Sequence, residues 1–234
     1  MKIGGLQKLT LIDYPGHVAA TVFLCGCNLR CPWCYSKELV LPELIKNQPE
    51  IVEKDFFGFL SERKGLLEGV VVCGGEPTIN EDLVRFVGKI KRMDFLVKLD
   101  TNGSNPAMLR DLFKKHLIDY VAMDIKQSPK SSRKYNEATG LKAGLLKIKE
   151  SIGLIKNSGV DYEFRTTIVP HVHTKEDIIE IAKWLAPAKK YYLQGFRGEK
   201  TINPQLEGQR PFSDEELLDI RKIIAPFFEI CEIR

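Results

Sequence analysis

Residues 21–36 read TVFLCGCNLRCPWCYS, an apolar run that leads into a cysteine-rich loop. Cys27, Cys31 and Cys34 are separated by three residues and then by two. The apolar run predicts a β-strand, and Pro32 interrupts regular structure inside the loop. A loop of this kind can turn its thiols toward one point, because neither strand nor helix geometry holds them apart.

These thiols indicate a site for a soft metal. Sulfur ligands suit zinc, copper(I) and iron–sulfur clusters. A structural zinc site takes four protein ligands, but Cys25 is too close to Cys27 for a tetrahedral chelate, and His17 lies beyond the predicted strand. A four-iron cluster held by three cysteines would leave one iron open to a reactive ligand. The spacing therefore favours an iron–sulfur cluster, with zinc and with core or redox thiols as alternatives.

The composition is that of an ordinary soluble chain. Of 234 residues, 44% are hydrophobic and 28% are charged, and the net charge of +4 does not imply a nucleic-acid partner. Residues 1–5 lack the apolar run of a signal peptide, and the longest apolar run, near residues 18–25, is far short of the ~20 residues that span a bilayer. Six cysteines indicate metal or redox chemistry rather than a disulfide scaffold. We expect a cytoplasmic protein without nucleic-acid or membrane partners.

Apolar runs alternate with helical patterns along the chain, which predicts a parallel sheet with helices outside. The predicted strands are residues 17–24, 69–73, 95–99, 120–123, 162–169 and 190–193. A complete (β/α)8 barrel takes ~250 residues, so six units fit this chain better. We expect an α/β fold, a partial (β/α)6 TIM-like barrel with parallel strands that is open on one side. Residues 1–234 are expected to form a single domain, with its core at about 17–200 and a terminal helix and short strand at 213–233.

Helices are predicted from apolar periodicity and from capping residues. The predicted helices cover about residues 50–67, 80 onward, 106–116, 142–157, 174 onward and 213 onward. Ser213, with Glu216 three residues later, has the pattern of a capping box. The basic run between Lys126 and Lys142 is interpreted as a solvated loop, with a partner-docking face as the alternative.

A second feature follows the second predicted strand, where the chain reads Gly74-Gly75-Glu76-Pro77. Two glycines permit unusual dihedral angles and let a ligand approach the backbone. A tight turn before a helix would use the same residues. Ligands of parallel α/β folds bind at the carboxyl ends of the strands, so these residues are candidates for a binding site.

The cysteine spacing, with Trp33 before the last cysteine and Gly74-Gly75-Glu76-Pro77 downstream, resembles the radical S-adenosylmethionine (SAM) superfamily. The resemblance implies the same partial barrel. It also implies that Cys27, Cys31 and Cys34 hold a [4Fe–4S] cluster whose open iron binds the amino and carboxylate groups of SAM. One electron then cleaves SAM to a 5′-deoxyadenosyl radical. In this family the GGEP motif contacts the amino group of SAM, and Trp33 is expected beside the cofactor.

Polar residues end the next two predicted strands, as Asp100-Thr101-Asn102-Gly103 and Asp124-Ile125-Lys126. Taken alone, these are a turn and a surface ion pair. They resemble motifs of the pyruvate formate-lyase activating enzymes, where such residues surround SAM. The resemblance implies that Asp100, Thr101 and Asp124 hold a monovalent cation near the SAM carboxylate. It also implies that Lys126 contacts SAM, with Asn102 in the same cofactor-binding group.

Other titratable residues are less diagnostic. Arg165 lies within a predicted parallel strand, so its charge must be paired or face the barrel interior, and we expect it to point at SAM or substrate. His171 and His173 have the spacing of two metal ligands, but a loop after a proline is the favoured interpretation. Cys25 and Cys73 end the first two strands, near the cluster but not necessarily ligating it.

Residues 4–16, GGLQKLTLIDYPG, with 38–40 and 162–167, resemble activating proteins of anaerobic ribonucleoside-triphosphate reductase. The resemblance implies that the radical removes a hydrogen atom from one glycine of that large partner, leaving a glycyl radical. It also implies an electron donor such as flavodoxin or ferredoxin. This chain has Tyr35-Ser36 where that family commonly has His-Asn, so partner or adenine contacts could differ here.

Two alternatives remain at this point. The chain could be a radical SAM enzyme that acts directly on a small molecule or a peptide, because the core motifs would be identical. It could also be a non-enzymatic zinc or iron–sulfur binding module.

Overall fold

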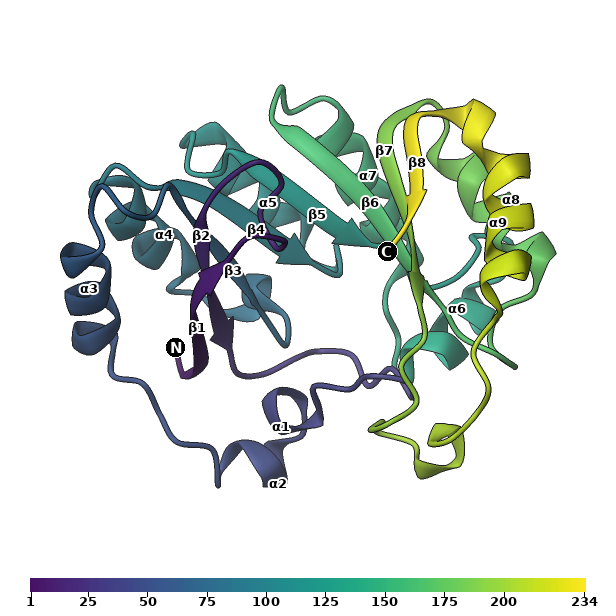
Figure 1. The fold of residues 1–234 in the computed structure, drawn as a ribbon, viewed down its shortest axis with the longest axis horizontal. Coiled ribbons are helices and arrows are strands. Elements are labelled where there is room, and N and C mark those ends of the chain that lie inside the picture. Colours follow the sequence, from purple (N-terminus) through teal and green to yellow (C-terminus); the bar gives the residue numbers. More distant parts are fainter.

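The computed structural model describes residues 1–234, which build one eight-stranded sheet in the order β1 to β8. Strands β2 to β8 are parallel to their neighbours, and β1 pairs antiparallel with β2. The strands are β1 (Ile3–Thr10), β2 (Ala19–Leu24), β3 (Gly69–Gly74), β4 (Leu96–Thr101), β5 (Tyr120–Asp124), β6 (Asp161–Ile168), β7 (Ala188–Gly195) and β8 (Phe228–Ile233). Figure 1 shows the sheet between flanking helices.

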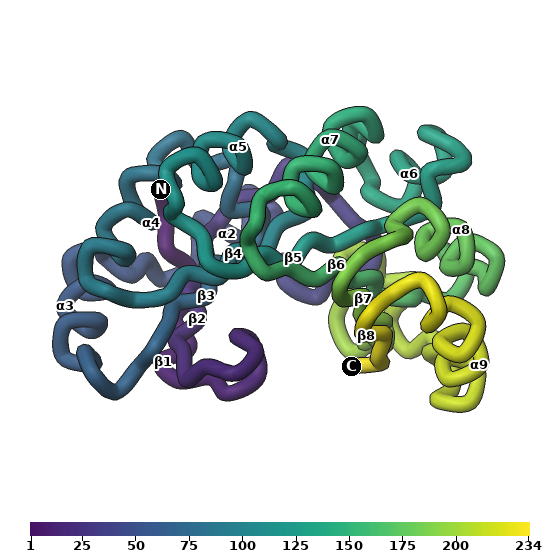
Figure 2. Tube along the Cα trace, turned by 90° about the horizontal axis from the view of Figure 1, so that it is seen from above, coloured from purple at the N-terminus to yellow at the C-terminus, as the bar shows by residue number.

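Most helices lie outside the curved sheet. They are α1 (Lys37–Val40), α2 (Pro42–Ile45), α3 (Glu53–Glu62), α4 (Leu83–Lys91), α5 (Pro106–Lys114), α6 (Ser132–Thr139), α7 (Leu145–Lys156), α8 (Lys175–Leu185) and α9 (Asp214–Ile224). Figure 2 shows the strands as an arc, with α3, α4, α5, α7, α8 and α9 on its convex side. The arc does not close into a barrel, because β1 and β8 do not pair. None of the helices combines the length and apolar character that crossing a bilayer requires.

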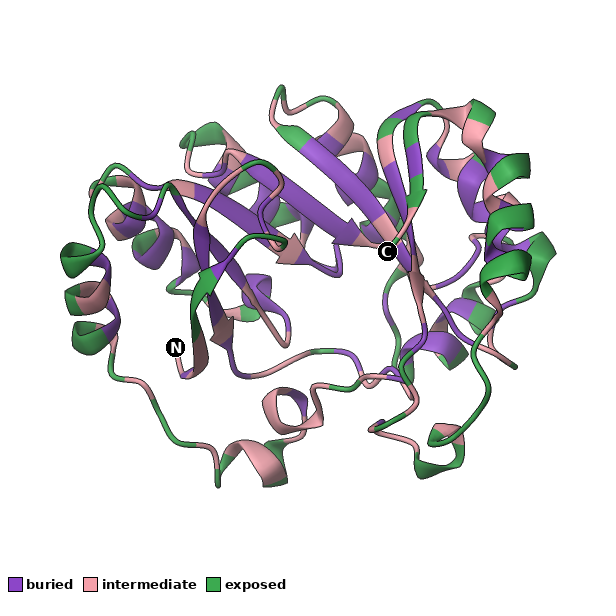
Figure 3. Ribbon diagram, in the orientation of Figure 1, coloured by how far each residue is buried: buried purple, intermediate pink, exposed green.

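The alternation of side chains along each strand separates two environments. In β3, Val70 and Val72 join the main apolar core between sheet and helices, whereas Val71 faces the barrel interior. The interior holds only a small apolar cluster, made by Val71 with Tyr14, Ala19 and Tyr120. Burial of the outer faces drives this arrangement, and Figure 3 shows the buried colour concentrated in the strands and on the sheet-facing sides of the helices. The interior remains free for polar side chains.

The predicted fold class is confirmed, because the six predicted strands correspond to β2 through β7. The predicted terminal strand is confirmed as β8, parallel to β7. The predicted capping box at Ser213 is present, and Thr174 forms a second one with Asp177. Strand β1 was not predicted, because its glycines and its exposed Gln7 and Lys8 give a weak strand signal, so pairing with β2 decides its conformation.

Two helix predictions were wrong in detail. The helix predicted at 50–67 is confined to Glu53–Glu62, and the helix predicted from Asn80 begins at Leu83, after a 3₁₀ turn at Pro77–Ile79. The basic run interpreted as a loop contains α6, a helix whose N-terminus is capped by Ser131. Helix α6 was not predicted because few of its residues face the core, so its sequence is mostly polar. The short helices α1 and α2 were also not predicted.

Helix α6 packs its C-terminus against the cysteine loop. The Arg30 amide donates to the Thr139 carbonyl at 2.8 Å. Gly140 follows with a φ of 67°, and a Cβ atom there would lie 2.2 Å from the Arg30 carbonyl oxygen. Only glycine therefore fits between α6 and the loop.

Replacing Gly140 by alanine tests this packing, and Gly208 provides the matched control. Gly208 also has a positive φ, of 74°, but a Cβ atom there would have no other atom within 4 Å. We expect Gly208→Ala to lower the free energy of unfolding by about 1 to 2 kcal/mol, the cost of the left-handed backbone. Gly140→Ala adds a collision with Arg30 and should lose about 3 kcal/mol or more. Urea denaturation followed by circular dichroism measures both, and equal losses would contradict the packing.

Candidate functional site

The cysteine loop follows β2 and crosses the carboxyl edge of the parallel strands. The Gly26 amide donates to the Leu39 carbonyl, and the Gly26 carbonyl accepts from the Glu76 amide, each at 2.7 Å. Leu29 is buried in the main core. The loop is thereby fixed at its start to the turn after β3 and in its middle to the core.

None of the three loop thiols is in a disulfide, and Cys31 and Cys34 are near enough to Cys27 to affect it electrostatically. The pKa of the Cys27 thiol is raised to about 12, mainly by burial and then by the Glu76 carboxylate, with smaller contributions from Cys31 and Cys34. Burial likewise raises the pKa of Cys31 to about 11. No three His, Cys, Asp or Glu side chains converge closely enough to hold a single metal ion. Thiols are the soft donors that iron–sulfur clusters and zinc both take.

The glycine pair after β3 is required by close approach of the cysteine loop. A Cβ atom on Gly75 would lie 2.0 Å from the Gly26 carbonyl oxygen, and one on Gly74 would lie 2.3 Å from the Leu24 backbone. The Gly75 amide donates to the Leu24 carbonyl at 2.9 Å, whereas the Gly75 carbonyl accepts none of the loop hydrogen bonds. That carbonyl is available to a ligand donor. Pro77 begins the 3₁₀ turn that follows.

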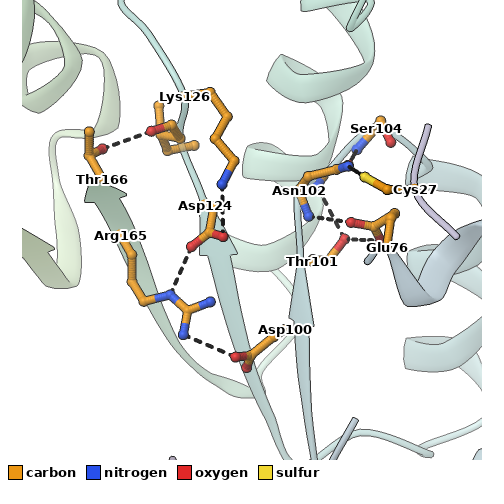
Figure 4. Close-up of polar contacts among 12 residues, drawn as sticks. Cys27, Glu76, Asp100, Thr101, Asn102, Ser104, Asp124, Lys126, Arg165 and Thr166 are labelled. Carbon is orange, nitrogen blue, oxygen red and sulfur yellow. Dashed lines mark hydrogen bonds and ion pairs between the residues drawn. The ribbon is translucent and has the colours of Figure 1, made fainter. Parts of the chain in front are cut away.

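The buried Glu76 carboxylate forms what we call the brace, a set of hydrogen bonds to Thr78, Thr101 and Asn102 that holds this edge of the sheet together. Its Oε1 accepts from the Thr78 amide, the Thr78 hydroxyl and the Thr101 hydroxyl, at 3.0, 2.5 and 2.8 Å. Its Oε2 accepts from the Asn102 amide at 2.6 Å (Figure 4). Burial raises the pKa of Glu76 above its usual range. The carboxylate is thus occupied by the protein, so a ligand would meet the backbone of this motif rather than the Glu76 side chain.

Asn102 extends the brace to the cysteine loop. Its side-chain amide donates to the Asn28 side-chain oxygen at 3.1 Å and lies 4.0 Å from the Cys27 sulfur. Asn28 in turn donates to the Ser104 hydroxyl at 2.8 Å. The end of β4 therefore positions the first cysteine. Asn28 and Ser104 were not singled out from the sequence, because no motif marks a partner so distant in the chain.

Charged side chains from β4, β5 and β6 form one network inside the barrel. The Arg165 Nε donates to Asp124 at 2.8 Å, and its guanidinium also donates to Asp100 at 3.1 Å (Figure 4). The Lys126 ammonium donates to the other oxygen of Asp124 at 3.0 Å. Lys98, also buried, pairs with Asp100. The structure therefore brings together the predicted Asp100, Asp124, Lys126 and Arg165.

The network keeps its members charged despite burial. Burial alone would raise the pKa of each aspartate, but the Arg165 guanidinium holds the pKa of both Asp100 and Asp124 below the usual range. Burial likewise opposes the charge on Lys126, yet Asp124 and the Cys31 thiol raise its pKa. Glu163 also lies 3.9 Å from Arg165 and pairs with Arg234, so the network holds four basic side chains and three carboxylates, an excess of one positive charge. The site can therefore attract an anionic ligand group beside the cysteines.

Trp33 and His173 support the other side of the cysteine loop. Trp33 is buried, and its ring packs edge-on against His173 with 5.7 Å between centroids. The Val169 amide donates to His173 Nδ1 at 3.0 Å, and Nε2 lies 2.9 Å from the Lys126 carbonyl, which assigns the proton to Nε2. Burial lowers the pKa of His173. His171 is exposed, whereas His173 is buried, so the two side chains lie in different surroundings.

Replacing Glu76 by glutamine tests the brace. A glutamine amide presents a donor where one carboxylate oxygen now accepts, so a buried N–H or hydroxyl loses its partner. We expect the free energy of unfolding to fall by about 1 to 3 kcal/mol. The matched control is Glu43→Gln, at an exposed residue of α2 with no side-chain hydrogen bond, which should change little. Chemical denaturation measures both, and an unchanged stability of the Glu76 variant would contradict the role of the carboxylate.

Comparison with known proteins identifies the family. The model of the radical SAM superfamily matches residues 21–185, a range that includes the three loop cysteines and Gly74 to Pro77. A candidate glycyl-radical enzyme activating enzyme of Methanocaldococcus jannaschii is 32% identical over 237 residues, 99% of this chain and 95% of the relative. The pyruvate formate-lyase-activating enzyme of Clostridium pasteurianum is 28% identical over 192 residues, 77% of this chain and 74% of that enzyme.

The fold is also similar to that of solved structures. Streptococcus suis SuiB bound to S-adenosylmethionine superposes with a TM-score of 0.66 at 14% identity, over 91% of this chain and 51% of SuiB. The chain thus spans about half the length of that structure, and at this identity the likeness concerns the fold alone. The cysteine triad, the glycine turn and the family match over most of the chain lead to one conclusion. The chain belongs to the radical SAM superfamily.

Proposed function

We propose that this radical SAM enzyme activates a glycyl-radical enzyme, with anaerobic ribonucleoside-triphosphate reductase as the partner. The observation that carries the proposal is the loop of three neighbouring thiols, positioned by Glu76 and Asn102 at the carboxyl edge of an open sheet. The Methanocaldococcus relative, similar along nearly the whole chain, supports the same class of reaction.

Cys27, Cys31 and Cys34 would hold the [4Fe–4S] cluster, and the sulfur donors fit that group. When bound, the cluster supplies an electron and an open iron for the amino and carboxylate groups of SAM. The chain positions the cofactor around it. The Gly75 carbonyl can accept a hydrogen bond from the SAM ammonium, because Gly74 and Gly75 have no side chains in the way.

The other predicted residues have supporting roles in this proposal. Glu76, through its four hydrogen bonds, and Pro77 shape the turn. Trp33 packs the loop against His173, and Asn102 lies beside the Cys27 sulfur. All four would therefore fix the place of the cofactor, whether or not their side chains touch it.

The charged network would orient SAM or the substrate. The Lys126 ammonium pairs with Asp124 and also interacts electrostatically with Cys31 and Cys34, so it can contact the SAM carboxylate. Arg165 bridges Asp100 and Asp124 and can turn toward a bound ligand. The implied monovalent cation would take the same two carboxylates as ligands. Since Arg165 already contacts both and Thr101 donates to Glu76, cation binding would require Arg165 to move.

The open side of the sheet gives a glycine loop of a protein partner a way in, since β1 and β8 leave the barrel unclosed. Tyr35, where the resembled activators have histidine, is 62% exposed. Its hydroxyl can meet the partner or the adenine of SAM with different hydrogen-bonding chemistry. A flavodoxin or ferredoxin would supply the electron.

The direct test is anaerobic reconstitution of the cluster, followed by incubation with reductant, SAM and an anaerobic ribonucleotide reductase. We expect 5′-deoxyadenosine by chromatography and the electron paramagnetic resonance signal of a glycyl radical on the reductase. Cys31→Ala should abolish both, because the cluster loses a ligand. Cys231→Ala, at a buried cysteine of β8 far from the loop in sequence, is the control and should retain both.

Full SAM cleavage by the Cys31 variant would show that the site is wrongly assigned. Cleavage without a glycyl radical, together with a product from a small molecule or peptide, would support direct action on that substrate instead.

A further inference from the structure

The positive charge of the chain is concentrated in residues 130–149. This segment has six basic residues and one acidic residue, a net charge of +5, whereas the whole chain carries +4. The basic residues, all exposed, are Lys130, Arg133, Lys134, Lys142, Lys147 and Lys149. The rest of the chain therefore carries a small net negative charge, opposite in sign to the net charge of the segment.

Part of this charge has no partner within the protein. Lys130, Arg133 and Lys134 contact Glu180, Glu137 and Asp177, at 3.3, 2.8 and 3.7 Å. The ion pairs of the protein include neither Lys142 nor Lys147. Free positive charge of this kind extends into solvent and can attract an acidic surface.

Exposed leucines lie in the same part of the chain. Leu141, in the loop after α6, is 46% exposed, and Leu146, in the first turn of α7, is 83% exposed. Each directly precedes one of the unpaired lysines. We call Leu141, Lys142, Leu146 and Lys147 the basic-apolar face. Protein interfaces commonly have an apolar centre and a polar, solvent-accessible rim, the roles that these leucines and lysines can take.

The basic-apolar face is close to the cysteine loop. The Arg30 amide of that loop donates to Thr139, and Gly140 packs on the Arg30 carbonyl, one residue before Leu141. From the same helix, the Tyr135 hydroxyl accepts from the Lys126 amide at 3.3 Å and lies near enough to Cys31 for the two to interact electrostatically. In Figure 1 the loop that follows β2 runs below the sheet toward α6. The end of α6, through Thr139 and Gly140, thus joins this face to Arg30 of the cysteine loop.

We propose that the basic-apolar face docks the electron donor, an acidic one-electron carrier protein of the flavodoxin kind. The inference rests on the proposed function, because reductive cleavage of SAM needs one electron from outside. The reduced carrier loses one electron and the oxidised cluster gains it, and no bond forms or breaks. Complementary charge steers the two proteins together, and the exposed leucines provide an apolar contact from which water is excluded.

Charge reversal tests the face without risk to the core, since both lysines are exposed. The variant is Lys142→Glu with Lys147→Glu. The matched control is Lys54→Glu with Arg63→Glu, which changes the net charge equally at exposed residues of α3 and its C-terminal cap that form no ion pair. Reconstituted proteins are titrated with an acidic bacterial flavodoxin by calorimetry, and oxidation of flavodoxin hydroquinone is followed by stopped flow.

We expect the face variant to weaken flavodoxin binding and slow electron transfer by about 10-fold at low salt, and the control to change either by less than about 2-fold. The wild-type rate should fall with added salt, and the variant's rate should depend on salt less. Equal effects in the two variants, or none in the face variant, would overturn the docking proposal.

Dithionite separates this proposal from the proposed function. It reduces the cluster without docking, so dithionite-driven SAM cleavage should be the same in the face variant and the wild type. No cleavage by the wild type with dithionite would contradict the proposed function itself. A face variant that binds flavodoxin normally, yet makes less glycyl radical with dithionite, would assign the face to the reductase and overturn docking of the electron donor.

Discussion

The buried carboxylate of Glu76 is the interaction on which the site depends. A carboxylate removed from water is tolerated only when donors satisfy it, and here four hydrogen bonds do so. Those donors join the turn after β3 to the end of β4. Through the Glu76 amide and Asn102, the same brace reaches Gly26 and Asn28 and so determines where Cys27 lies. The cysteine loop has little regular structure of its own, and its shape is imposed by its neighbours.

The side chains that stabilise the fold and the side chains of the proposed site lie on opposite faces of the sheet. Apolar side chains of the strands face the helices, and polar side chains of the same strands face the barrel interior. Arg165 remains ionised there because Asp100 and Asp124 are its partners. A prearranged polar interior at the carboxyl edge can orient a charged cofactor and exclude water, which is what a protein contributes to radical chemistry.

Much of this could be predicted from the sequence. Strands β2 to β7 are short apolar runs, and Ser213 with Glu216 is a local cap, so both leave a signal within a few residues. The cysteine spacing and the glycine pair are local motifs too. The remainder depends on contacts between distant residues. Strand β1 is extended because it pairs with β2, and α6 packs through a single buried face that includes Tyr135. The hydrogen-bond partners of Glu76 are brought together only by the pairing of β3 with β4.

His173 is a further example of a residue whose role depends on distant contacts. The spacing of two histidines in the sequence does not show whether His173 is buried or is an ordinary loop residue. Its role follows from burial against Trp33 and from two backbone partners, neither of which the sequence reveals.

The central claim is that three thiols hold a cluster with one iron open to SAM. Electron paramagnetic resonance of the anaerobically reconstituted, reduced protein tests it most directly, with and without SAM. We expect the iron content of a [4Fe–4S] cluster and a spectrum that changes when SAM is added. An unchanged spectrum, or zinc bound in place of iron, would contradict it.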